Sequence, residues 1–473
     1  MKKLLLLLLF PIFSIAQTQV GGDIDGVSSF DYFGSSVAIA ANGSIVAVGC
    51  NNKNEATVYK NISGTWTQLG ATINGVGNDN SGKSVSLSSD GTVLAVGAIT
   101  SGHTRVYKYL SGTWSQVGTD MVGSEYSGNS VSLSADGTII AIGAPYADGS
   151  PFTDSGVVYI YRNVAGTWTQ IGLILGESTG DLSGISVSLS SNGTVVAIGA
   201  YNNDGNGSNS GQVRVYKNIS GTWTQIGSDI NGEAAEDYSG VSVSLSSDGN
   251  SVAIGAPKND GNGDLSGQVR VYRNNSGTWT KIGADIDGYS SQDRSGTSVS
   301  LSANGNVVAI GAPYYGNSGN NLNKGQVRLF VNVSGTWTQI GSDIYGEAYT
   351  DTSGSSIALS PTGNIVVIAA TSNNGNGLND CGHVRVFSIS EVLASDQFVQ
   401  ANFKCYPNPA SATVTIELNE SLQLETVNIY TTLGQLVKTE KNKEISVASL
   451  VKGNYFIEVI TNQGKATKTV IVE

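Results

Sequence analysis

The sequence predicts an all-β protein: a seven-bladed β-propeller closed by a strand from the N-terminus, followed by a small β-sandwich. Three observations predict this fold. A unit of about 50 residues recurs seven times. Each unit holds short runs of alternating or β-branched residues that are joined by tight turns. The last unit lacks its fourth run, and a segment that would complete it lies near the start of the chain.

The repeat is clearest between Ser239 and Thr280. Its first run, 243–246, alternates apolar residues with serine, and the Asp-Gly pair at 248–249 is a strong hairpin signal because both residue types tolerate positive φ. The second run, 252–257, combines β-branched residues with Ala and Gly, whose small size lets neighbouring sheets approach closely. A third alternating run and a Trp-containing fourth run follow, as is typical of a propeller blade rather than a solenoid coil. The turn glycine recurs at Gly43, Gly91, Gly137, Gly193, Gly249, Gly305 and Gly363.

The two ends of the repeat region indicate a closed ring. The Trp run is present in six units, at Trp66, Trp114, Trp168, Trp223, Trp279 and Trp337. The seventh unit ends at Val384–Phe387 without one, whereas Thr18–Ile24 aligns with Thr224–Ile230 of the fourth unit. We therefore expect the first residues of the mature chain to form the outer strand of the last blade.

These repeats resemble a known family. Phe33–Ala38 and the repeated Ala-Ile-Gly-Ala-Pro at 253–257 and 309–313 are similar to the FG-GAP repeats of integrin α-chain propellers, over roughly residues 17–388. The Phe-Gly pair is literal only in the first unit, and Ser-Gly replaces it in the others. The acidic calcium loop that the family carries between its first two strands is absent, because the turn here is too short to wrap an ion. The resemblance therefore implies the fold but not calcium at that turn.

The N-terminus predicts secretion. Lys2 and Lys3 precede the apolar run 4–13, and Ser14-Ile15-Ala16 offers a cleavage site after Ala16, so residues 1–16 are expected to be a signal peptide. We expect no membrane span in the mature protein, because no later apolar run approaches membrane length. The formal net charge is −12, with 25 Lys and Arg against 37 Asp and Glu, which argues against nucleic acid as a partner.

Composition changes after a predicted linker at 389–403. Residues 404–473 carry 7 Lys and 7 Glu but no Arg or Trp, with alternating strands at 414–418, 427–430 and 455–460. This segment resembles the type A C-terminal sorting domain of type IX secretion cargo in Bacteroidetes. The similarity is carried by Tyr406–Pro409, Leu433–Val437, Gly453–Tyr455 and the terminal Lys468–Val472. It implies the type IX machinery as a partner, export through the periplasm, and release or attachment at the cell surface. An ordinary adhesive sandwich domain is the alternative.

An acid recurs in all seven units just before the Ser-Gly or Phe-Gly step. It lies in the loop from one blade's outer strand to the next blade's inner strand, on the same face as the long loops between second and third strands. A ring of carboxylates there could bind a cation or a basic ligand. The alternative is that each carboxylate accepts a hydrogen bond from the backbone of its own turn. The seven acids are Asp31, Asp79, Glu125, Asp181, Asp237, Asp293 and Asp351.

Two further loop features are candidate sites. Asp260, Asn262 and Asp264 place oxygens at alternate positions, a spacing that calcium loops use, and Asp204 with Asn206 forms a weaker copy. Calcium is accordingly the one candidate cofactor, although plain Asn/Asp/Gly turns have the same composition. Cys50 and Cys381 lie in the first and last blades, where a disulfide could staple the ring.

Catalytic motifs are absent from the sequence: it contains no H-E-x-x-H, G-x-S-x-G or phosphate loop. The two histidines, His103 and His383, occupy a slot that Gln212, Gln268 and Gln326 fill in other units. A repeated Arg of the third strand is expected to pair with an acid, with a sialidase-like cluster as the alternative. The Trp residues are expected to pack between blades, with sugar stacking as the alternative.

We therefore expect a secreted or surface-displayed propeller that is not an enzyme and that binds a glycan or a protein through its loop-rich face. An extracellular hydrolase or lyase acting on glycans is the alternative function, and a purely structural role in a surface layer is a third. A cluster of acids, Tyr or His that breaks the sevenfold symmetry would favour an enzyme.

Overall fold

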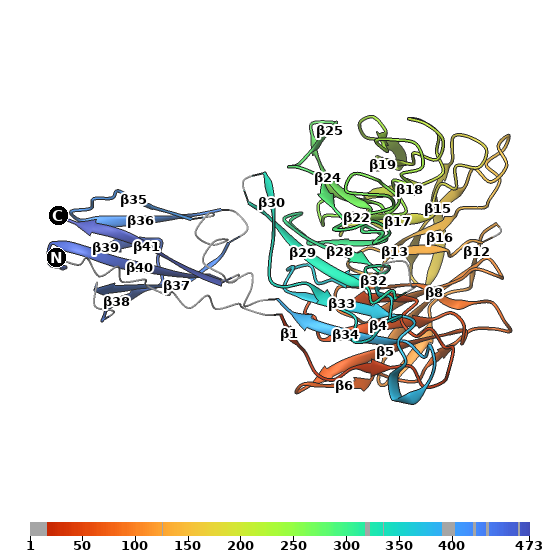
Figure 1. The fold of residues 1–473 in the computed structure, drawn as a ribbon, viewed down its shortest axis with the longest axis horizontal. Helices are drawn as coiled ribbons and strands as arrows, with labels where there is room; N and C mark the ends of the chain where they lie inside the picture. The colour runs from red at the N-terminus through yellow and green to blue at the C-terminus, as the bar shows by residue number, and fades with distance from the viewer. Residues whose placement is uncertain are drawn as a thin grey trace, which may run out of the picture. The chain divides into compact units, whose positions relative to one another are not determined.

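The structure is a computed structural model that describes residues 17–124, 126–316, 322–333, 335–389, 403–419, 422–431, 435–461 and 464–473. The predicted signal peptide (1–16) and residues 390–402 of the predicted linker lie outside these ranges. Two compact units result, one spanning Gln19–Ser388 and the other containing the C-terminal residues from Ile389 onward. Figure 1 shows the strands of both units.

The larger unit consists of seven antiparallel sheets, each built from four successive runs of strand, as the repeat predicts. The outer run is broken into two pieces in every blade except the third. Blades 1 to 3 comprise β3 (Ser36–Ile39), β4 (Ile45–Cys50), β5 (Glu55–Ile62), β6 (Thr65–Gln68) and β7 (Ile73–Asn74); β8 (Ser81–Leu87), β9 (Val93–Ala98), β10 (His103–Leu110), β11 (Thr113–Gln116) and β12 (Met121–Val122); and β13 (Ser130–Leu133), β14 (Ile139–Ala144), β15 (Val157–Val164) and β16 (Thr167–Leu175).

Blades 4 to 6 repeat this arrangement. They comprise β17 (Ser186–Leu189), β18 (Val195–Ala200), β19 (Gln212–Ile219), β20 (Thr222–Gln225) and β21 (Ile230–Asn231); β22 (Ser242–Leu245), β23 (Ser251–Ala256), β24 (Gln268–Asn275), β25 (Thr278–Lys281) and β26 (Ile286–Asp287); and β27 (Ser298–Leu301), β28 (Val307–Ala312), β29 (Gln326–Val333), β30 (Thr336–Gln339) and β31 (Ile344–Tyr345).

The seventh blade is completed by the N-terminus, which confirms the predicted closure. Its own strands are β32 (Ser353–Leu359), β33 (Ile365–Ala370) and β34 (His383–Ser388), with a short 3-10 helix, η1 (Gly375–Gly377), in the loop before β34. The outer strand is supplied by β1 (Thr18–Gln19) and β2 (Ile24–Asp25), which both pair with β34. Ile24 lies opposite Val384 and is buried in the joint core with it. Figure 1 shows β1 beside β34.

Small residues and serines hold neighbouring blades together, as the close-approach argument predicts. A Cβ on Gly255 of β23 would lie 2.0 Å from the carbonyl oxygen of Gly296 in the next blade, so only glycine fits. Ser242 Oγ donates to that same carbonyl at 2.8 Å, and Ser244 Oγ accepts from Leu301 N at 2.9 Å. The alternating serines of the first strand are therefore inter-blade hydrogen-bonding groups.

The tryptophans behave as packing residues. Trp279 is half-buried against the core between blades 4 and 5, and its Nε1 donates to the carbonyl of Ile226 in the preceding blade at 2.7 Å. Trp66, Trp114, Trp168 and Trp337 each make the equivalent bond to the preceding blade. For Trp66 the acceptor is the carbonyl of Val20 in the closing segment, so this segment takes the place that the outer strand of the preceding blade has elsewhere.

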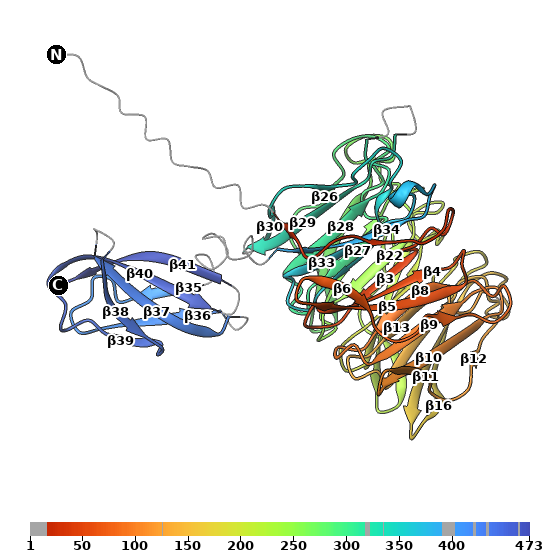
Figure 2. The ribbon, with the colours of Figure 1, turned by 90° about the horizontal axis from the view of Figure 1, so that it is seen from below.

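The two faces of the ring differ. The hairpins between first and second strands and between third and fourth strands are tight, and they form the short-turn face. The loops between second and third strands, and the loops that lead into the next blade, form the loop-rich face. Figure 2 shows the blades from a second direction. At the short-turn end the first strands enclose a cavity of about 170 Å³ ringed by residues such as Leu245 and Leu301.

The C-terminal unit is a smaller all-β structure of two sheets, consistent with the strands predicted there. Its strands are β35 (Phe403–Tyr406), β36 (Thr413–Leu418), β37 (Leu424–Thr431), β38 (Leu436–Glu440), β39 (Glu444–Ser446), β40 (Gly453–Thr461) and β41 (Gly464–Val472). One sheet has the order β35-β36-β39 and the other β38-β37-β40-β41. Alternate residues of both sheets, including Val414, Val427 and Val459, are fully buried.

Candidate functional site

The recurring acids are structural in the described part of the chain. Each of Asp31, Asp79, Asp181, Asp237, Asp293 and Asp351 is at most 6% exposed. Each accepts a hydrogen bond of 2.7–3.1 Å from the backbone N–H three residues earlier in its own turn. Burial raises the pKa of Asp181 and Asp293. Glu125 lies outside the described residues. The geometry therefore supports the turn-bonding alternative and presents no open ring of carboxylates to a ligand.

Four of the five repeated arginines form ion pairs with acids, as expected, and Arg328 is the exception. Arg105 Nη1 lies 2.8 Å from Asp79 and its Nε lies 3.0 Å from Asp120. Arg214, Arg270 and Arg385 pair at 3.2–3.6 Å with a glutamate from the loop before their own blade: Glu177, Glu233 and Glu347. Arg328 instead donates to the carbonyl of Asp287 in the preceding blade at 2.6 Å. These contacts engage each of the five guanidinium groups, and they leave no free guanidinium cluster of the sialidase kind among the described residues.

The side chains of the predicted calcium loops form hydrogen bonds within their own loop and to the neighbouring loop. Asp260 Oδ1 accepts from Leu265 N at 2.7 Å, and Asp264 Oδ2 accepts from the Gln292 amide at 2.6 Å. Asn262 donates to two carbonyls of the adjacent loop. In the weaker copy, Asp204 Oδ1 accepts from Asn209 N, while Asn206 donates to the carbonyls of Gly232 and Glu233. This geometry favours the plain-turn alternative over calcium.

The disulfide considered from the sequence is not formed. Cys50 and Cys381 are both free and buried. Cys50 Sγ donates to the carbonyl of Asp31, whereas Cys381 Sγ donates to carbonyls of its own loop, at Asn373 and Gly375. Burial raises the pKa of Cys50 to about 12, so this thiol stays protonated. Each thiol therefore donates to nearby backbone carbonyls, and the two sulfur atoms are not bonded to each other.

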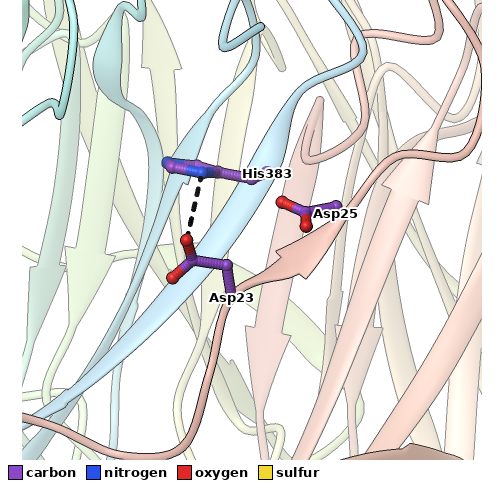
Figure 3. Close-up of side chains that lie close together, drawn as sticks. All are labelled: Asp23, Asp25 and His383. Carbon is purple, nitrogen blue, oxygen red and sulfur yellow. Dashed lines mark ion pairs between the residues drawn. The ribbon is translucent and has the colours of Figure 1, made fainter. Parts of the chain in front are cut away.

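The slot that two histidines and three glutamines share lies beside acidic residues in the closing blade. His103, His383 and the three glutamines all lie opposite the last Ala of the second strand, which confirms that they share one position. His383 is 1% exposed, and Asp23 and Asp25 of the closing segment lie beside it (Figure 3). Within the described residues, these three form the one group of His, Cys, Asp or Glu side chains close enough to hold a metal ion. Sequence reasoning aligned the closing segment but did not connect its acids with His383.

A second group that sequence reasoning missed lies on the loop-rich face. Seven residues of blades 3 to 6 form what we call the aromatic belt. They occur just before the first strand or just after the second strand. Six of them lie at two loop positions that are small and polar in blades 2 and 7, such as Asn80 and Thr100, while Tyr201 lies one residue before the second of these positions. Blade 1 also has a tyrosine, Tyr32, at the first position. The belt comprises Tyr126, Tyr146, Tyr201, Tyr238, Lys258, Arg294 and Tyr314.

Contacts between rings and cations hold the belt together. Tyr126 and Tyr146 lie with ring centroids 4.8 Å apart, and Tyr201 and Tyr238 lie 5.2 Å apart. Lys258 Nζ lies 3.7 Å from the Tyr238 ring centroid, and the Arg294 guanidinium stacks over Tyr314 at 4.5 Å. Tyr126 and Tyr146 are each 39% exposed. The signal in the sequence is the replacement of small polar residues by tyrosine and basic residues at two recurring loop positions, which hold six of the seven belt residues.

Comparison with known proteins supports both units. Residues 404–473 match the family model of the secretion system C-terminal sorting domain, and residues 176–216 match that of the FG-GAP repeat. The chain is similar to the Kuenenia stuttgartiensis hydrazine synthase structure, with a TM-score of 0.50 and 12% identity over 78% of this chain and 97% of that chain. At that identity the likeness concerns the fold alone. No curated protein matches the sequence.

These findings define the class of protein: a β-propeller with FG-GAP repeats that carries the sorting domain of type IX secretion cargo. The sorting domain marks it for secretion or display at the cell surface through that machinery. None of the described residues forms a helix that is both long and apolar enough to cross a membrane.

Proposed function

We propose that this secreted propeller is a non-catalytic binding protein whose loop-rich face, over blades 3 to 6, binds a glycan or a protein. The aromatic belt carries this proposal. Tyrosine offers a large, rigid and amphipathic contact surface at low entropic cost, and Tyr and Arg are enriched among the residues that dominate binding energy. Exposed rings also stack on the apolar faces of sugars. The belt breaks the sevenfold symmetry, as a specific binding surface on a repeat scaffold must.

The state of the recurring carboxylates favours binding of a glycan over its hydrolysis. General acid–base chemistry on a glycan needs a pair of carboxyl groups facing an open cleft. Six of the seven recurring carboxylates are buried and engaged by backbone N–H groups. The carboxylates next to His383 lie in the closing blade, away from the belt in blades 3 to 6. A glycan-acting hydrolase or lyase is therefore the less supported alternative.

A glycan array probed with the secreted protein tests the proposal, followed by binding measurements on any hit. The variant Y126A/Y146A/Y238A is expected to bind about 100-fold more weakly, because it removes three contact rings, and to melt close to wild type, because none of the three rings is fully buried. The matched control I62S/L110S/I219S removes three exposed side chains, 51–60% exposed, beside the turns of the short-turn face, and it should bind normally. Equal binding by the belt variant, or degradation of the bound glycan, would refute the proposal.

A further inference from the structure

Closure of the ring gathers acidic side chains around one buried imidazole. His383 lies on β34, and Glu347 comes from the loop before the blade. Asp23 immediately precedes the closing strand β2, and Asp25 is the last residue of that strand. His383 Nδ1 lies 3.9 Å from Asp23 Oδ2 and 4.0 Å from Glu347 Oε2. These separations are too long for hydrogen bonds. Figure 3 shows the imidazole and the two aspartates from the two ends of the propeller chain converging.

The imidazole has no hydrogen-bond partner where one is expected. His383 is 1% exposed, and its Nε2 is buried without a partner. Nε2 is the ring nitrogen opposite Nδ1, and His103 Nδ1 and Gln268 Oε1 are likewise buried without a partner at the same slot. A ligand is therefore indicated by the spacing of Nδ1 and the carboxylates rather than by this orphaned nitrogen. Asp25 does have one contact, because Asn376 donates to its Oδ2 at 3.0 Å. Asp23 accepts from Gln19 through its other oxygen, Oδ1, at 2.6 Å.

Blade 5 contains the same three acids and shows what is missing from the closing blade. Glu233, Asp285 and Asp287 occupy the positions of Glu347, Asp23 and Asp25 there. Lys281 Nζ lies 2.7 Å from Asp285 and 3.7 Å from Glu233. The amide of Gln268 lies 3.3 Å from Glu233 and 3.2 Å from Asp287.

In the closing blade both of these donors are replaced. Gln19 stands where blade 5 has Lys281, and His383 stands where blade 5 has Gln268. Both blades retain the arginine that pairs with the glutamate, Arg385 and Arg270. Three carboxylates facing one guanidinium therefore leave two negative charges uncompensated in the closing blade. In blade 5 the ammonium of Lys281 removes one of these two.

We propose that Asp23, Asp25 and His383 bind one divalent transition-metal ion, of which Zn²⁺ is the representative, with Glu347 at the edge of the site. One ligand atom from each of the three side chains lies within 4.8 Å of the others. Tetrahedral bonds of about 2.0–2.2 Å separate neighbouring ligand atoms by about 3.3–3.6 Å, so the three side chains would move closer together when the ion binds. A mixed imidazole and carboxylate set suits Zn²⁺ and its neighbours, whereas Ca²⁺ takes oxygen ligands.

The position of the site gives the ion a role in closure. Two ligands come from the N-terminal segment, and the third comes from β34, so the ion joins the ends of the propeller chain. Binding to the folded ring but not to the opened ring would stabilise the closed form by mass action. The disulfide considered at this joint is absent, and the metal would supply the cross-link in its place.

Zinc titration of the purified full chain, followed by ¹⁵N NMR of the histidine rings, tests this proposal. The chain has only 2 His, so each imidazole can be assigned. One equivalent of Zn²⁺ is expected to bind, to shift the Nδ1 resonance of His383 and to leave His103 unchanged. Chelation should reverse the shift and lower the melting temperature by a few degrees. A Ca²⁺ titration run in parallel should leave both imidazoles unmoved.

Variants distinguish the site from adventitious binding. H383Q installs the residue that three other blades carry at this position, so it should fold, and it should weaken Zn²⁺ binding by at least about 100-fold. D23N provides a second test from the other end of the chain. H103Q is the matched control and should bind Zn²⁺ like wild type. Zn²⁺ binding that persists in H383Q, or that leaves the His383 resonance unmoved, would overturn the proposal, and so would equally tight Ca²⁺ binding.

Discussion

Deleting residues 17–26 behind the signal peptide is expected to lower the free energy of unfolding of the propeller by about 5 kcal/mol or more. The deletion removes Ile24 from the core of the joint. It also removes the Val20 N–H that donates to Val386 at 2.7 Å. Trp66 Nε1 would lose its acceptor, the carbonyl of Val20. The edge of β34 would then be exposed, which favours aggregation.

Denaturant unfolding of the deleted and intact chains measures this effect. A synthetic peptide of residues 17–26 should restore part of the lost stability, because an added strand can pair with the free edge of β34. A scrambled peptide of the same composition serves as the control. If the deleted chain unfolds at the same denaturant concentration as the intact one, the N-terminal strand does not close the ring.

Replacing Arg105 by Met is expected to destabilise the protein by about 3–5 kcal/mol, because it leaves a buried carboxylate without its cation. Asp79 is 3% exposed, and its Oδ2 lies 2.8 Å from the Arg105 guanidinium. The double variant R105M/D79N should recover much of the loss, since no buried charge then remains. Denaturant unfolding of the three proteins gives the comparison.

Arg328 provides the matched control for this experiment. It occupies the same position of its blade, but it donates to the carbonyl of Asp287 and to Ser295 Oγ. R328M should therefore cost less than R105M, about 1–2 kcal/mol, because its hydrogen-bond acceptors are neutral and the buried carboxylate of Asp293 interacts with its charge without a direct ion pair. Equal losses in R105M and R328M would mean that the Arg105 ion pair adds nothing beyond ordinary hydrogen bonds.

The fold could be predicted from the sequence because its determinants are local and repeated. Serine alternating with apolar residues in 242–245 and the Asp-Gly turn at 248–249 each imply one piece of structure, and seven copies reinforce the inference. The closing strand was also predictable, because Thr18–Ile24 matches the outer-strand pattern of other blades. Even so, the role of the alternating serines in bonding adjacent blades became evident only from their contacts.

The sites could not be predicted in the same way, because they depend on side-chain direction and register. Asp237 looks like a loop acid in the sequence, yet its carboxylate turns inward to Ala234 N and is buried. Asp25 and His383 become neighbours only through the pairing of β2 with β34, which the alignment of residues 18–24 did not extend to cover. The aromatic belt arises from residues that depart from the repeat consensus, whereas repeat analysis concentrates on what recurs.

Hydrogen exchange of the protein with and without a ligand identified on the array shows which face of the propeller binds. We expect protection confined to the loops before the first strands and after the second strands of blades 3 to 6, around Tyr126, Tyr146 and Tyr238. The ligand should be recovered chemically unchanged. Protection on the short-turn face, or recovery of cleaved ligand, would contradict the claim that this propeller binds, without catalysis, through its loop-rich face.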